Sequence, residues 1–150
     1  MSFYRRNKKG FTLVEVVVVI AIIAILGSII AVSVMAILKN SEKKAVSTKL
    51  TSYWKITSTA FSQINKGFAT ATSPSATFLE SRLPLKNSQI KLGTEKCTSI
   101  SKDESIYIQY TKNTKSVNNK YTLVCIWLRY NGKYYYTTDG KDVTGPKDSP

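Results

Sequence analysis

The sequence predicts an α+β fold in which one long N-terminal helix is followed by a three- to four-stranded antiparallel sheet. Residues 12–65 contain no proline, and the apolar residues of their second half recur every three to five positions, as in a helix with one buried face. Farther along the chain, Tyr121–Tyr130 and Lys133–Thr138 are strand-like runs joined by Asn131-Gly132, the strongest short-range signal for a hairpin. At 150 residues, the chain has room for one folded domain.

The first half of the predicted helix is apolar on every side. No residue from Val16 to Leu38 is charged, and these 23 residues exceed the roughly 20 that a helix needs to cross a bilayer. Residues 1–9 contain four basic residues and no acidic one, which predicts that this end stays in the cytoplasm. We therefore expect a membrane helix over residues 11–38. A secretory signal peptide is the first alternative, but its apolar core would be shorter.

Glu15 is a carboxylate in otherwise apolar surroundings. An ionised carboxylate at the centre of a membrane helix costs roughly 2.5 kcal/mol or more, and it is rarely found there without a function or a partner. The cost is lower near the membrane edge, so a glutamate that faces lipid headgroups is the alternative. The stretch Gly10-Phe11-Thr12-Leu13-Val14-Glu15, between a basic leader and a long apolar run, resembles the processing site of type IV pilins and pseudopilins.

This resemblance implies a precursor with a leader peptide over residues 1–10. A prepilin peptidase would cut between Gly10 and Phe11, and the same enzyme would N-methylate the new Phe11 amine. Residues 11–38 would hold the chain in the membrane and then pack into a filament, where Glu15 would neutralise the terminal amine of a neighbouring subunit. Residues 39–150 would form an extracellular globular domain that includes the second half of the helix.

The second half of the helix, Lys39 to Asn65, is amphipathic, and Lys66-Gly67 predicts its end. Turn-forming residues dominate 69–93, which predicts a connecting loop. Strands are predicted at Ser105–Thr111 and in the two runs of the hairpin, and this sheet would cover the apolar stripe of the helix. The stripe consists of Ala45, Leu50, Trp54, Phe61 and Ile64.

Catalysis is not predicted, and no cofactor is expected. The chain has no histidine, no pairing of a nucleophile with a base, no glycine-rich phosphate loop and no zinc-ligand spacing. Asp139 and Asp142 are weak candidates for calcium, because Ca²⁺ takes six to eight oxygen ligands. Cys97 and Cys125 are candidates for a disulfide worth about 3 kcal/mol in an oxidising exterior, and two buried free thiols are the alternative.

The chain is strongly basic, with 22 Lys and Arg against 9 Asp and Glu. Loss of the leader would remove four basic residues and leave a formal charge of +9. Basic side chains neutralise phosphates and aromatic rings stack on bases, so we hypothesise binding of an anionic polymer, extracellular DNA first. A solubilising surface adapted to a negatively charged cell wall is the alternative. The candidate residues are Lys112, Lys115, Lys120, Arg129, Lys133, Tyr134, Tyr135, Tyr136 and Lys141, with Lys147 and Tyr130 nearby in the sequence.

The resemblance implies a structural subunit of a type IV pilus-like surface filament that serves adhesion, biofilm formation or motility. The implied partners are the prepilin peptidase and methyltransferase, other copies and other pilins in a helical filament, the pilus assembly machinery, and the membrane before assembly. A pseudopilin of a DNA-uptake or type II secretion machine is the main alternative. A monomeric membrane-anchored binding domain is a weaker one.

Overall fold

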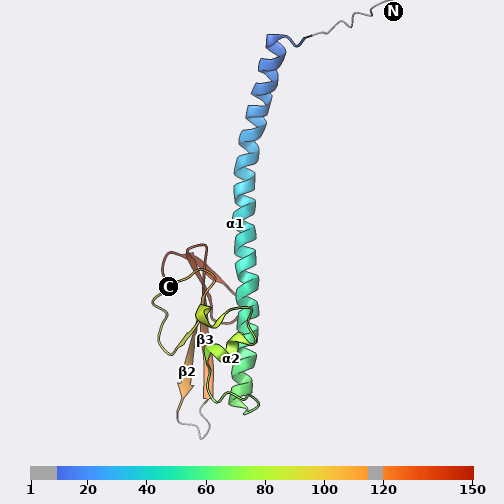
Figure 1. The fold of residues 1–150 in the computed structure, drawn as a ribbon. Coiled ribbons are helices and arrows are strands. Elements are labelled where there is room, and N and C mark those ends of the chain that lie inside the picture. The colour runs from blue at the N-terminus through green and yellow to red at the C-terminus, as the bar shows by residue number, and fades with distance from the viewer. Residues whose placement is uncertain (1–9, 115–119) are drawn as a thin grey trace, which may run out of the picture. The chain divides into compact units, whose positions relative to one another are not determined.

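The computed structural model describes residues 10–114 and 120–150, apart from the side chains of residues 29–33. It contains two compact units, of which the first ends at Glu42 and the second comprises Lys43–Pro150. Helix α1, Leu13–Asn65, passes through both units (Figure 1). The shorter elements are α2 (Ala76–Glu80), η1 (Asn87–Gln89), β1 (Ile90–Gly93), β2 (Ile106–Asn113), β3 (Lys120–Tyr130), β4 (Lys133–Thr137) and β5 (Thr144–Lys147).

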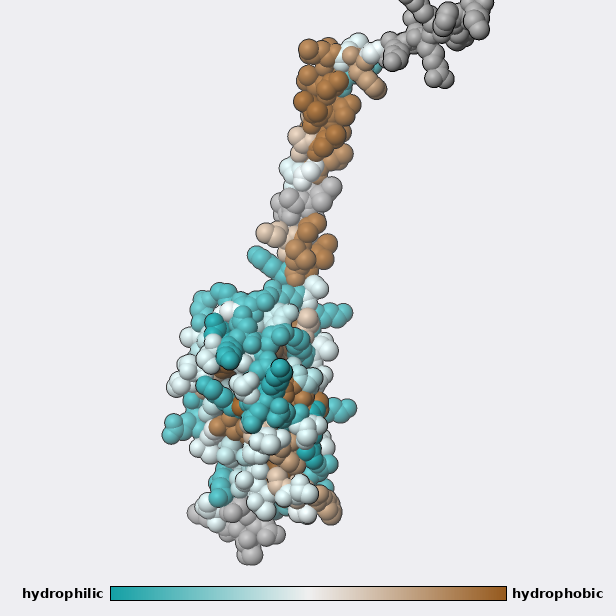
Figure 2. All heavy atoms as spheres, in the orientation of Figure 1, coloured by the Kyte–Doolittle hydropathy of each residue, from teal (hydrophilic) through white to brown (hydrophobic). Residues whose placement is uncertain are grey.

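In its described residues, the first unit consists mainly of the N-terminal part of α1, which is apolar from Val16 to Leu38. Its large apolar side chains between Leu13 and Leu38, where described, are 45–80 % exposed, and Figure 2 shows two brown stretches along this helix. Among the described residues, no helical stretch combines the length and the hydropathy needed to cross a bilayer. The membrane role of residues 11–38 stays a prediction.

Helix α1 ends where the sequence predicts, directly before Lys66-Gly67. Gly67 has a φ of +71°, in the left-handed region that favours glycine. The Phe68 N–H donates to the Gln63 carbonyl (2.9 Å), and the Gly67 N–H donates to the Ile64 carbonyl (3.0 Å). These two hydrogen bonds form a Schellman motif, which satisfies carbonyls that the end of a helix leaves without partners.

The sheet has five strands in the order β1-β2-β3-β4-β5, which corrects the predicted three or four. The predicted strands correspond to β2, β3 and β4, and Asn131 and Gly132 form the predicted turn with φ of 49° and 73°. β1 runs parallel to β2, and the other neighbouring pairs are antiparallel. The sequence does not reveal β1 and β5, because each has four residues and β5 contains Gly145 and Pro146.

The main core lies between the second half of α1 and one face of the sheet. Leu50, Phe61 and Ile64 of the predicted stripe are buried, whereas Trp54 is half-buried and Ala45 is exposed. The stripe actually begins one residue later than predicted, and its buried positions repeat every three to four residues. They are Val46, Leu50, Tyr53, Thr57, Ala60, Phe61 and Ile64.

A second, smaller cluster covers part of the opposite face of the sheet. Ile126 and Leu128 of β3 belong to the main core, whereas Cys125 and Trp127 belong to the second cluster. This alternation follows from the two-residue period of a strand. Cys97 and Ile100, from the loop between β1 and β2, complete the second cluster, so this loop covers part of the outer face.

Candidate functional site

The N-terminus of α1 is closed by a reciprocal pair of residues, Thr12 and Glu15. The Thr12 N–H and Oγ1–H each donate to Glu15 Oε2 at 2.8 Å, and the Glu15 N–H donates back to Thr12 Oγ1 at 3.3 Å. This is a capping box, in which residues three positions apart satisfy each other's polar groups. The spacing Thr-x-x-Glu is its signal in the sequence, but from the sequence we consider Glu15 only for contacts between subunits or with lipid headgroups.

The expected cleavage site lies just outside this capped helix. Gly10 and Phe11 both precede α1, and Phe11 is 87 % exposed. A Cβ added to Gly10 would meet no atom within 4 Å. The Gly10–Phe11 bond is therefore in an accessible segment without helical hydrogen bonds, as a peptidase requires.

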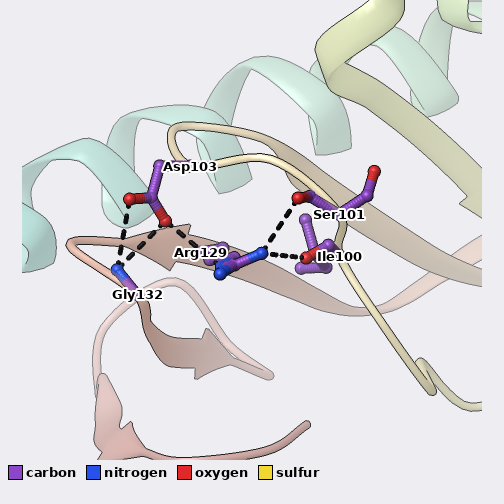
Figure 3. A network of polar contacts seen from close by, with 5 residues as sticks. All are labelled: Ile100, Ser101, Asp103, Arg129 and Gly132. Carbon is purple, nitrogen blue, oxygen red and sulfur yellow. Dashed lines mark hydrogen bonds and ion pairs between the residues drawn. The ribbon is translucent and has the colours of Figure 1, made fainter.

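Arg129, a candidate for polymer binding, is engaged within the protein. Its Nε lies 3.2 Å from Asp103 Oδ1, and its guanidinium donates to the carbonyls of Ile100 (3.0 Å) and Ser101 (2.9 Å). Figure 3 shows Asp103 between Arg129 and Gly132, whose N–H donates to the same carboxylate at 3.0 Å. Arg129 therefore ties the loop over the outer face to β3, and Asp103 ties the same loop to the β3–β4 turn.

The other candidates for polymer binding do not form one patch. Lys133 pairs with Asp148, and this hydrogen bond raises the pKa of Lys133. Tyr135 is buried in the main core. Lys112 and Lys120 lie at one end of the β2–β3 pair, whereas Arg129 lies near the other end of β3, which is 11 residues long. The remaining candidates are Tyr134, which is half-buried, Tyr136, described next, Lys141, which is exposed, and Lys115, which lies outside the described residues.

A cleft opens on the outer face of the sheet beside a stacked pair of aromatic rings. The Trp127 and Tyr136 rings stack with centroids 4.4 Å apart, since these residues are register partners on β3 and β4. Lys147 Nζ lies 4.8 Å from the Tyr136 centroid and 5.9 Å from that of Trp127. Lys96, Gln109 and Thr138 also line this cleft. The sequence pointed to Tyr136 and Lys147, but not to Trp127 or Lys96, because only strand register and the loop bring them together.

Cys97 and Cys125 are free thiols in the structure, both buried in the second cluster. Burial, with a smaller effect of the Cys125 charge, raises the pKa of Cys97 to about 11. The Cys125 Sγ–H donates to Gln109 Oε1 at 3.2 Å, and burial also raises the pKa of Cys125. The disulfide between them stays a prediction, which a comparison of intact masses before and after reduction would test.

The weak calcium candidates, Asp139 and Asp142, lie in a turn in which the Asp139 carboxylate already accepts hydrogen bonds from the backbone. Asp139 Oδ1 accepts from the N–H groups of Lys141 (2.9 Å) and Asp142 (3.0 Å), and these bonds lower the pKa of Asp139. Within residues 10–114 and 120–150, no three His, Cys, Asp or Glu side chains gather closely enough to hold a metal ion.

The N-terminus of the chain matches a known family model. Residues 5–38 match the family model of the prokaryotic N-terminal methylation motif, which is the signature of type IV pilins and pseudopilins. The matched segment includes the Gly10–Phe11 junction, Glu15 and the whole uncharged run. No curated protein and no solved structure matches the chain.

Proposed function

We propose that this chain, with the N-terminal methylation motif over residues 5–38, is a structural subunit of a type IV pilus-like surface filament. The motif is the observation that carries the proposal. A prepilin peptidase removes residues 1–10 and methylates Phe11, and the accessible Gly10–Phe11 segment suits this step. The chain is a single-pass membrane protein before assembly and part of an extracellular filament afterwards.

Two features of the first unit support assembly through the helix. Its apolar side chains are exposed on the single chain, and exposed apolar surface of this extent marks a membrane or protein interface. Cleavage also creates a positive amine at Phe11, close to that surface. A buried charge without a partner costs several kcal/mol, whereas a matched pair approaches break-even, so Glu15 of a neighbouring copy would favour one register of packing.

Glu15 has a local role as well, and two substitutions separate the two roles. Glu15→Gln keeps the capping box, since Gln also serves at this position, but it removes the charge. Glu15→Ala removes both. We expect both variants to be cleaved normally and to assemble poorly, because both lack the carboxylate that pairs with the amine. Glu80→Ala, an exposed glutamate of α2, is the matched control and should assemble normally.

Assembly is measured by shearing filaments from cells and quantifying the subunit, and processing by mass spectrometry of its N-terminus. Normal assembly of Glu15→Gln with loss only in Glu15→Ala would limit Glu15 to capping its own helix. Absence of the unmodified subunit from the sheared fraction, with surface display unaffected by either substitution, would support the monomeric anchored domain instead. Residues 1–10 still attached in the surface-displayed protein would overturn the proposal.

Two finer proposals follow from the same motif and from the charge. The filament either is an extended pilus for adhesion or motility, or is the short filament of a DNA-uptake or secretion machine. Its globular units also bind an anionic polymer, which the formal charge of +9 that remains after loss of the leader supports. The length of sheared filaments in electron micrographs distinguishes the first pair of alternatives.

A further inference from the structure

We propose that the cleft beside the Trp127–Tyr136 stack is a phosphate-binding site, which takes the backbone of a phosphodiester polymer. This inference rests on the polymer-binding part of the proposed function and gives it a location. It replaces the dispersed set of basic residues with one place on the outer face of the second unit. The site is defined by Lys147, Lys96, Gln109 and Thr138, with the two rings as its wall.

Lys147 is a cation held in position by the aromatic wall. Its Nζ lies within 6 Å of both ring centroids, at 4.8 Å from Tyr136 and 5.9 Å from Trp127, which is the range of a cation–π contact. Trp127 is only 5 % exposed, so the wall itself is fixed by packing. An anion that binds here meets an ammonium group that is already placed, which reduces the entropy lost on binding.

The other polar groups of the cleft suit an oxyanion. Lys96 adds a second positive charge from the loop between β1 and β2. Gln109 uses its Oε1 to accept from the Cys125 thiol, which leaves its amide N–H groups as donors for a ligand. No acidic side chain is among the described residues that line the cleft. Phosphate oxygens accept several hydrogen bonds at once, and lysine binds phosphate as a point charge.

The aromatic rings favour recognition of a backbone over recognition of bases. Trp127 is nearly buried, and the ammonium of Lys147 lies over the Tyr136 ring, so neither ring offers a free face on which a base could stack. The cleft has a volume of about 410 Å³, enough for a short length of backbone as well as one phosphate group. A filament would repeat the cleft along its length, and a polymer that occupies several clefts gains avidity.

The test uses the full mature chain in detergent micelles and a fluorescein-labelled single-stranded oligonucleotide, with anisotropy measured over a salt series. The cleft variant is Lys96→Gln with Lys147→Gln. The matched control is Lys112→Gln with Lys120→Gln, which removes the same charge at the end of the β2–β3 pair farther from Arg129. We expect the cleft variant to bind more than 10-fold more weakly and the control to change less than 3-fold. Two lost phosphate contacts should also make the salt slope shallower by about 1.4.

Two further variants keep the result interpretable. Lys147→Arg should retain binding, since arginine also stacks on aromatic rings and contacts phosphate. Lys96→Gln alone leaves the ring contacts of Lys147 intact and should still weaken binding. If the double variant does not fold, this single variant still tests the cleft. Thermal unfolding followed by circular dichroism monitors folding in each case.

Equal losses in the cleft and control variants would overturn the proposal in favour of diffuse charge attraction. Displacement of the oligonucleotide by a polyuronate as efficiently as by unlabelled oligonucleotide would overturn the choice of phosphate. No binding by the unmodified chain at low salt would remove the polymer-binding function altogether. Filament assembly, measured separately, should be unchanged in the cleft variant, so a failure here is distinguishable from a failure of the filament proposal.

Discussion

At the scale of single residues, Glu15 shows how one side chain can have different partners at different stages. In the chain described here its carboxylate accepts two hydrogen bonds from Thr12, at 2.8 Å each. The proposed filament would offer it a methylated amine on another copy. The local bonds satisfy the carboxylate until that partner is present, which lowers the cost of carrying a charge into apolar surroundings.

Cys97 gives a prediction about pH. Burial raises its pKa from an ordinary 9.0 to about 11, so folding favours the neutral thiol. The stability that this thiol contributes is fully present below pH 9 and is lost as the pH rises through 11. We expect the free energy of unfolding, measured in urea, to fall by about 1.4 kcal/mol per pH unit in that window because of this group.

The control for this prediction is Cys97→Ala, which cannot titrate at this position. It should be less stable at pH 8, because the buried sulfur is lost, but its stability should decline less steeply above pH 9. Parallel curves for the two proteins from pH 9 to 11 would contradict the assignment to Cys97.

At the scale of elements, a turn after β4 depends on a glycine that contacts α1. Gly140 has a φ of +75°, and a Cβ built on it would lie 2.2 Å from Trp54 Cδ1. Gly140→Ala must therefore strain the backbone and displace the indole ring. We expect a loss of about 2–4 kcal/mol in the free energy of unfolding, from backbone strain together with overpacking.

Gly132→Ala is the matched control for Gly140→Ala. Gly132 has a similar φ of +73°, but a Cβ there would meet no atom within 4 Å. Only the backbone term remains, so we expect a loss of about 1 kcal/mol. Equal losses in the two variants, measured by urea unfolding, would show that the contact with Trp54 does not matter.

Elements with strong local signals could be predicted from the sequence, and elements defined by distant partners could not. Gly67 marks the end of α1 and Asn131-Gly132 marks the hairpin, because both positions require positive φ. The short strands β1 and β5 exist because β2 and β4 offer them edges. The cleft was missed for the same reason, since Lys96, Trp127 and Lys147 are far apart in the sequence.

At the scale of the whole molecule, the residues that the structure describes as buried all belong to the second unit. The first buried apolar residue along the described chain is Val46, shortly after the boundary at Glu42. A fragment of residues 43–150 should therefore fold without the apolar helix, because a domain with its own core can fold alone. We expect a cooperative urea transition by circular dichroism, with a midpoint close to that of the full chain.

A shorter fragment of residues 55–150 is the control for this prediction. It lacks Val46, Leu50 and Tyr53, which are at most 6 % exposed in the second unit. Its transition should be broad or absent. A cooperative transition in the shorter fragment, or none in the longer one, would place the boundary of the folded domain elsewhere.

The packing of Trp54 and Trp127 on opposite faces of the sheet gives the protein two separate optical reporters, since the sequence has two tryptophans. A Trp54→Phe variant would leave fluorescence from the indole at the outer face alone, and Trp127→Phe would leave only the one beside the helix. Emission spectra of the two variants would then follow the two faces independently during unfolding, without any attached dye.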